Sequence, residues 1–219
     1  MANQKNYIIG FIHVCMVNEF FEIFKEQISL IIKYGLYDVS RVINVGCVGS
    51  EENKLLIEEY IKAFPKVRIA AYSPDIKQYE YITLRVLKKT ADLSPDFYGF
   101  YIHSKGVSWP KHEGGKYWRD YMNYYNLQKW ELNTRMLDLG YETSGVKMIT
   151  RGYDHHYSGN FFWFKSKYVR ECLRPIEKLD TTNRFQAEFW ICSGKPVAAT
   201  LCQKFIDYSA KGIFNPNEK

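Results

Sequence analysis

The chain has 219 residues, of which 46% are hydrophobic, enough for one domain with a sizeable core. Its net charge of +6 favours an anionic partner, but Lys and Arg are scattered and form no dense basic tract of the kind that nucleic-acid binders carry. No apolar stretch approaches the roughly 20 residues that span a bilayer, and the N-terminus shows no signal-peptide pattern. Five cysteines without a C-x-x-C pair favour a reducing compartment. We therefore expect a soluble, cytoplasmic protein with at most peripheral membrane contact.

The first half of the chain alternates strand and helix patterns. Apolar runs predict buried strands at residues 7–14, 41–48, 67–72 and 96–103. Apolar residues at helical spacing predict helices between them, at residues 18–35, 50–64 and 79–93. This order predicts an α/β fold with a mostly parallel sheet flanked by helices on both faces.

The second half is less regular. A loop containing Pro110 and two adjacent glycines precedes a long helical pattern. The predicted elements that follow the loop are a helix at 117–139, an edge strand at 146–150, a strand at 158–164, and helices at 169–173 and 184–193. No internal repeat, low-complexity segment or convincing linker divides the chain, so we expect a single domain.

Polar residues gather where the strand that ends at His103 leaves the sheet. His103, Ser104, Lys105 and Gly106 follow an aromatic, apolar run. Ligands of α/β proteins bind at the carboxyl ends of strands, and this set of groups suits an anion such as a diphosphate. The alternative is an ordinary strand-to-loop turn with a solvated lysine.

A second polar group surrounds the predicted strand at 158–164. Asp154, His156, Ser158 and Asn160 supply groups that hydrogen-bond sugar hydroxyls, and Trp163 supplies a ring on which a sugar could stack. Asp154 and His156 could instead share a metal ion. The alternative is a polar turn that enters an aromatic core strand.

Glu188 is the third candidate. It lies on a predicted helix between large apolar residues, an environment that desolvates a carboxylate. A carboxylate in such a place can act as general base towards a sugar hydroxyl. The alternative is that Glu188 pairs with a nearby Arg or Lys, or faces water.

Taken in order, four motifs resemble those of small nucleotide-sugar glycosyltransferases of the GT-A fold, such as bacterial polysaccharide enzymes and the capsid-glycosylating transferases of chlorella viruses. The motifs are Y-I-H-S-K-G at 101–106, a Trp-bearing helix at 116–122, H-Y-S-G-N-F-F-W at 156–163 and A-E-F-W-I at 187–191. The resemblance spans roughly residues 7–192. It implies one GT-A-like, Rossmann-type domain in which residues 1–106 bind the nucleotide sugar and residues 107–219 bind the acceptor.

The resemblance also implies roles for single residues. His13 and Val14 should border the nucleotide, and Arg85 should reach the phosphates or the donor sugar, although a surface helix position also explains Arg85. The family's Asp-x-Asp motif, which holds Mn²⁺ or Mg²⁺, is missing here. Lys105 and His103 could neutralise a leaving diphosphate in its place. Alternatively, His103 could be a metal ligand together with Asp154 or His156, so a divalent metal cofactor stays open.

The resulting hypothesis is a hexosyltransferase that moves a sugar from a nucleoside diphosphate, with UDP-sugars favoured, to a glycan hydroxyl. Glu188 and Asp154 are its candidate catalytic residues, and Glu188 is the base if the reaction inverts configuration. The missing Asp-x-Asp favours the alternative of a non-catalytic glycan- or nucleotide-binding module. Nucleic acid is not expected as a partner, because the aromatic residues follow helical core stripes.

Overall fold

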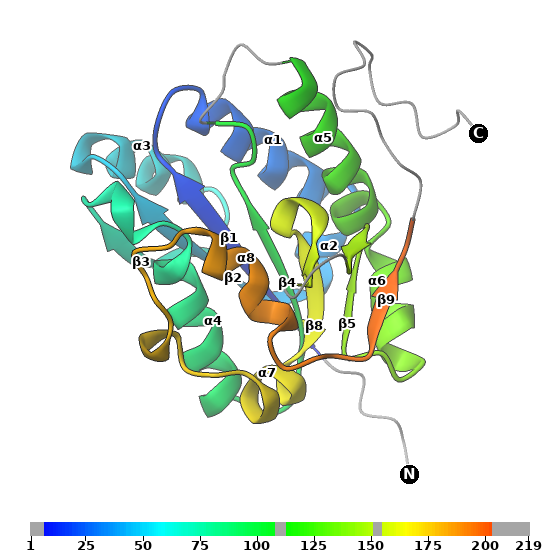
Figure 1. The fold of residues 1–219 in the computed structure, drawn as a ribbon. Helices are drawn as coiled ribbons and strands as arrows, with labels where there is room; N and C mark the ends of the chain where they lie inside the picture. The colour runs from blue at the N-terminus through cyan, green and yellow to red at the C-terminus, as the bar shows by residue number, and fades with distance from the viewer. Residues whose placement is uncertain (1–6, 108–112, 151–154, 203–219) are drawn as a thin grey trace.

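The computed structural model describes residues 7–107, 113–150 and 155–202, which form a sheet between two layers of helices (Figure 1). The sheet has seven strands in the order β3-β2-β1-β4-β8-β5-β9. Their bounds are β1 Ile8–Cys15, β2 Ser40–Val48, β3 Val67–Ser73, β4 Tyr98–His103, β5 Thr143–Gly145, β8 Phe162–Lys165 and β9 Ala198–Thr200. A separate two-stranded ribbon pairs β6 Met148–Ile149 with β7 His156–Tyr157.

The sheet is mostly parallel, as predicted. β1 pairs in parallel with β2 on one side and with β4 on the other, and β3 continues the parallel order beyond β2. β8 runs antiparallel to both β4 and β5, and β9 is parallel to β5. The order therefore reverses between β1 and β4, which makes these two strands the topological switch point of the sheet.

Each helical layer covers one face of the sheet (Figure 1). One layer contains α1 Phe20–Lys33, α2 Leu36–Val39, α3 Glu51–Ile61, α5 Glu113–Asn123 and α6 Trp130–Asp138. The other contains α4 Tyr81–Leu93, α7 Ser166–Cys172 and α8 Phe185–Phe189. The short turn η1 Ile76–Gln78 precedes α4, and the turn η4 Ile176–Lys178 follows α7. Along β1, Ile12 and Val14 pack into the first layer, whereas Ile9 and Phe11 pack into the second, as the alternation of a strand requires.

The predicted helix at 117–139 is wrong in one respect, because a π-helical segment, η2 Tyr124–Gln128, separates α5 from α6. The amide of Lys129 donates to the carbonyl of Tyr124 over five residues, at 2.9 Å. Backbone carbonyls of this segment accept hydrogen bonds from side chains. Trp163 Nε1 donates to Asn126 O at 3.0 Å, and Asn133 Nδ2 donates to Tyr125 O at 2.8 Å. These tertiary hydrogen bonds favour the π-helical turn over a continuous α-helix.

Three further elements also differ from expectation. The predicted strand at 158–164 begins as the turn η3 Ser158–Asn160, because Gly159 and Asn160 have positive φ angles of 80° and 54°. The predicted edge strand at 146–150 is replaced by β5, an interior strand between β8 and β9, and by β6. The helix predicted at 184–193 consists of α8 and a 3-10 turn, η5 Trp190–Cys192. Within the described ranges, no helix has the length and apolar character needed to cross a bilayer.

A glycine in β4 tests the packing between neighbouring strands. Gly99 pairs with Phe164 of β8, and the Phe164 ring lies where a Cβ on residue 99 would be. We expect Gly99→Ala to lower the free energy of unfolding by about 1–3 kcal/mol, since overpacking a buried site forces its neighbours to move. Chemical denaturation would measure the loss.

Gly115→Ala in α5 is the matched control, because its Cβ would lie at an ordinary contact distance of 3.6 Å from the Cα of Gly106. An unchanged or slightly raised stability is expected there, since Ala favours a helix over Gly by about 1 kcal/mol. Equal stability of the Gly99→Ala variant and the wild type would contradict the packing described for β4 and β8.

Candidate active site

The candidate site lies at the carboxyl ends of β1 and β4. His13 of β1 is the register neighbour of His103 of β4 on one side and of Gly46 of β2 on the other. Ligands of open α/β sheets bind outside the carboxyl ends of the strands at this kind of switch point. The structure therefore brings together two of the histidines that the sequence indicated.

His103 is held in one tautomer by the turn that precedes β8. Its Nε2 lies 2.8 Å from the carbonyl oxygen of Gly159, so Nε2 carries the proton and donates it. Burial, reinforced by the positive charge of Lys105, lowers the pKa of His103 to about 4. The ring is therefore neutral at pH 7, and its Nδ1 is a hydrogen-bond acceptor.

His13 is buried beside α4. Its Nδ1 lies 2.9 Å from the hydroxyl of Thr83. Burial lowers its pKa to about 4, although the nearby carboxylate of Glu80 opposes the shift. Val14 is fully buried, and its side chain packs into the layer on the opposite face of the sheet from α4. That Val14 borders the nucleotide stays a prediction.

Lys105 lies over an aromatic ring of α5. Its Nζ is 4.1 Å from the centroid of Trp118, and its backbone carbonyl accepts a hydrogen bond from Arg119 Nη1 at 3.0 Å. Burial lowers the pKa of Lys105, and the negative charges of Glu188 and Glu80 act against that shift. The ammonium group thus lies within electrostatic reach of both carboxylates.

Glu80 was not expected from the sequence. It precedes α4, and its Oε2 accepts hydrogen bonds from the Tyr101 hydroxyl and from Asn160 Nδ2, both at 2.5 Å. Its Oε1 lies 3.8 Å from His103 Nδ1. The one local signal in the sequence was an acidic residue at the start of a predicted helix. Glu80 joins partners that lie 21 and 80 residues away in the chain.

Ser104 and Gly106 shape the loop after β4. The Ser104 hydroxyl accepts a hydrogen bond from the Cys15 amide at 3.0 Å, and the Ser104 amide donates to His13 O at 3.0 Å. Gly106 has a φ of 87°, which a side chain would strain. These two residues join the ends of β1 and β4, so their contacts are with the protein backbone and position the loop that carries Lys105.

The remaining candidates lie in different surroundings. Arg85 Nη1 donates to Gln78 Oε1 at 3.2 Å, and its Nε lies 3.7 Å from Glu177, which fits the surface helix position that we considered. The His156 ring packs edge-on against Phe189, with centroids 5.2 Å apart. Ser158 is buried.

Trp163 was expected to offer a stacking surface, but it is fully buried, and its ring packs against Phe100 with centroids 5.3 Å apart. It therefore belongs to the core. Asp154 lies outside the described residues.

The described residues do not assemble a metal site. Among them, no group of three or more His, Cys, Asp or Glu side chains converges as metal ligands would. His103 uses Nε2 for Gly159 O, and His156 lies against Phe189, so these two candidates do not form a ligand set within that part of the chain. We derive no step through a metal ion.

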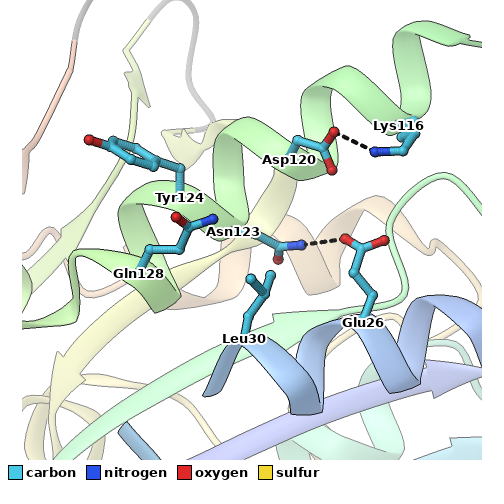
Figure 2. A pocket seen from close by; sticks show the side chains of 7 residues that line it. All are labelled: Glu26, Leu30, Lys116, Asp120, Asn123, Tyr124 and Gln128. Carbon is cyan, nitrogen blue, oxygen red and sulfur yellow. Dashed lines mark hydrogen bonds and ion pairs between the residues drawn. The ribbon is translucent and has the colours of Figure 1, made fainter. Parts of the chain in front are cut away.

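A cavity of about 380 Å³ lies in the helical layer that contains α1, between α1 and the α5–η2 segment (Figure 2). Its lining residues are Glu26, Leu30, Lys116, Asp120, Asn123, Tyr124 and Gln128. Asn123 Nδ2 donates to Glu26 at 3.0 Å, and Lys116 pairs with Asp120 at 2.6 Å (Figure 2). None of the candidate residues from the sequence lines this cavity.

Comparison with known proteins supports the fold. No protein-family model matches the chain, and no curated protein matches its sequence. A solved structure of 4-diphosphocytidyl-2C-methyl-D-erythritol synthase from Anaerococcus prevotii DSM 20548 is similar, with a TM-score of 0.51, 8% identity and 94% of each chain covered. A second structure of a synthase of that name matches with a TM-score of 0.49, 11% identity, and coverage of 95% of this chain and 93% of the other. The first likeness shows a single-domain α/β fold with a mostly parallel sheet.

The buried histidines predict a pH dependence of stability. Histidine in an unfolded chain titrates near pH 6.5, whereas His13 and His103 titrate near pH 4 in the fold. Between these values the unfolded chain binds protons that the native protein does not, so stability is full above pH 6.5 and falls as the pH approaches 4. Between pH 4 and pH 6.5, the free energy of unfolding rises with pH, and His13→Gln should reduce this slope by about 1.4 kcal/mol per pH unit. Urea unfolding at several pH values would measure it.

The exposed His155 provides the control for that experiment. We expect His155→Gln to keep the wild-type slope. A wild-type slope in His13→Gln as well would show that the burial of His13 does not hold it neutral. The slope is the decisive quantity, because loss of the Thr83 contact changes stability at every pH.

Proposed function

We propose that the chain is a nucleotide-dependent transferase and, within that class, a glycosyltransferase that moves a sugar from a nucleoside diphosphate to a hydroxyl acceptor. The observation that carries this proposal is the position of Lys105, which follows the carboxyl end of β4 at the switch point, with its Nζ over Trp118 and within electrostatic reach of Glu80 and Glu188. The similar solved structure adds support, because its name denotes a product with a diphosphocytidyl group. UDP-sugars are the favoured donors, residues 1–106 the donor half and residues 107–219 the acceptor half.

In the proposed reaction, the acceptor oxygen forms a bond to the anomeric carbon of the sugar. The bond from that carbon to the phosphate oxygen breaks, and its electron pair leaves with the nucleoside diphosphate. Lys105 stabilises the negative charge that develops on the leaving oxygen. Glu188 accepts the proton of the acceptor hydroxyl if configuration inverts, and positions the acceptor if it is retained.

A second candidate is nucleotidyl transfer, which the similarity to the diphosphocytidyl-methylerythritol synthase favours. The two reactions break different bonds. Glycosyl transfer releases a nucleoside diphosphate from a nucleotide sugar, whereas nucleotidyl transfer from a nucleoside triphosphate releases pyrophosphate. Chromatography of the products therefore separates them, and binding without turnover would favour a non-catalytic module.

The donor is found by measuring melting temperature with UDP-, GDP-, CMP- and dTDP-sugars, each with and without Mn²⁺. A ligand that binds the native state at 100 times its Kd stabilises it by about 2.7 kcal/mol, which raises the melting temperature visibly. We expect one nucleotide class to give this rise. No shift with any of them would contradict a nucleotide-sugar transferase.

Lys105→Ala tests the role of the cation. We expect turnover with the donor so identified to fall at least tenfold, which is about 1.4 kcal/mol of lost transition-state stabilisation. The fold should be unchanged by circular dichroism, because the Lys105 carbonyl that accepts from Arg119 belongs to the backbone.

Lys33→Ala is the matched control, since Lys33 also lies over an aromatic ring, that of Tyr34 at 5.4 Å, but on the surface of α1. It should turn over at the wild-type rate. Equal rates in the Lys105 and Lys33 variants would remove Lys105 from the mechanism.

A further inference from the structure

Three hydrogen-bond acceptors meet beside β4 without a donor from the described residues. His103 Nδ1 is unprotonated because Nε2 holds the proton and donates it to Gly159 O. Glu80 Oε1 lies 3.8 Å from Nδ1, too far for a hydrogen bond, while Oε2 takes both donors that reach this carboxylate. Asn160 is 1% exposed, and its Oδ1 has no partner among the described residues.

Hydrogen bonds from Tyr101 and Asn160 hold the Glu80 carboxylate next to the other two acceptors. Asn160 Nδ2 donates to Glu80 Oε2, so the Asn160 amide lies against the Glu80 carboxylate. Tyr101 donates to the same oxygen and holds the carboxylate from the strand side. Asn160 Oδ1 is a buried acceptor without a donor among the described residues, which is unfavourable, and the two neighbouring acceptors are also open to a donor, so this arrangement favours a ligand that supplies donors.

The group is open to a ligand on one side. The side chains of His103 and Glu80 are 13% and 16% exposed, so ligand atoms can reach them. Two neighbouring hydroxyls of a sugar ring offer one donor each, about 3 Å apart, which suits two acceptors separated by 3.8 Å. A divalent cation is less suited, because Glu80 is the one charged member of the group and the ammonium of Lys105 acts electrostatically on both His103 and Glu80.

From this geometry we propose that His103 Nδ1 and Glu80 Oε1 bind a vicinal diol of the substrate, with Asn160 Oδ1 beside them as a further acceptor. The inference rests on the proposed function, because the diol belongs to a nucleotide sugar. It comes either from the ribose or from the transferred sugar. Glu80 is thus a residue that touches substrate, and Tyr101 and Asn160 position it.

Glu80→Gln tests the diol site with little change in shape. Its carbonyl oxygen keeps the hydrogen bonds from Tyr101 and Asn160, and its new NH₂ group faces His103 Nδ1 as a donor. The variant therefore places a donor beside His103 Nδ1 and removes the acceptor that the diol needs. Glu131→Gln, an exposed position on α6, has the same change in charge and serves as control.

The probes are UDP-glucose, UDP, dTDP-glucose and GDP-mannose, with affinity measured by titration calorimetry. We expect Glu80→Gln to lower the affinity for the probes that bind through the diol about tenfold or more. Glu131→Gln should leave the affinity for every probe unchanged. UDP has a diol on ribose alone, whereas dTDP-glucose has diols on glucose alone. Weaker binding of UDP assigns the ribose, and weaker binding of dTDP-glucose with unchanged UDP assigns the transferred sugar.

Other outcomes overturn the inference. If wild type and Glu80→Gln bind every probe equally, the diol site is wrong and the transferase proposal stands. If no probe binds the wild-type protein, both fall. Binding of MnCl₂ alone that is lost in Glu80→Gln would show that these acceptors hold a cation. If Glu80→Gln does not fold, His103→Gln replaces it, since its amide can still donate to Gly159 O and the same affinities decide.

Discussion

The parallel pairing of β1 on both of its edges is the constraint on which the rest of the structure depends. With β2 on one side and β4 on the other, the backbone groups of β1 are satisfied within the sheet, and helices cover both faces. The connection through α1 leads to β2, while α4 leads into β4 and covers the other face. The chain therefore leaves β1 and β4 at one edge of the sheet, and residues distant in sequence meet there.

Burial at that edge determines which groups are charged. His13 and His103 are neutral at pH 7 because burial lowers the pKa of each to about 4, and the positive charge of Lys105 adds to the shift of His103. Lys105 lies within electrostatic reach of Glu80 and Glu188, and its single positive charge offsets one of these two carboxylates. The site thus has neutral imidazoles that accept hydrogen bonds and one ammonium group that attracts an anion, a combination that suits a phosphorylated and hydroxylated ligand.

The strands of the first half could be predicted from sequence because each is an apolar run between turn residues, as in residues 8–15 and 40–48. Elements that depend on tertiary contacts could not. The π-helical turn at 124–128 has an ordinary helical pattern, and its hydrogen bond from Trp163 spans 37 residues. His103 and Lys105 were found because they follow a strand, whereas Glu80 was missed because its contacts to Tyr101 and Asn160 exist only in the folded chain.

The cavity beside α1 and the group at the switch point differ in what they leave for a ligand. In the cavity, Glu26 already pairs with Arg119 at 3.3 Å and Lys116 with Asp120, so a ligand would have to compete with these two ion pairs. Asn123 Oδ1 is a buried lining atom there that has no partner within the described part of the chain. At the switch point, Glu80 Oε1 and His103 Nδ1 have no donor within the described part of the chain. A ligand that donates to these two atoms gains its contacts without breaking a protein hydrogen bond. The volume of the cavity favours a ligand site beside α1, whereas the two acceptors without donors from the described residues favour a ligand site at the end of β4.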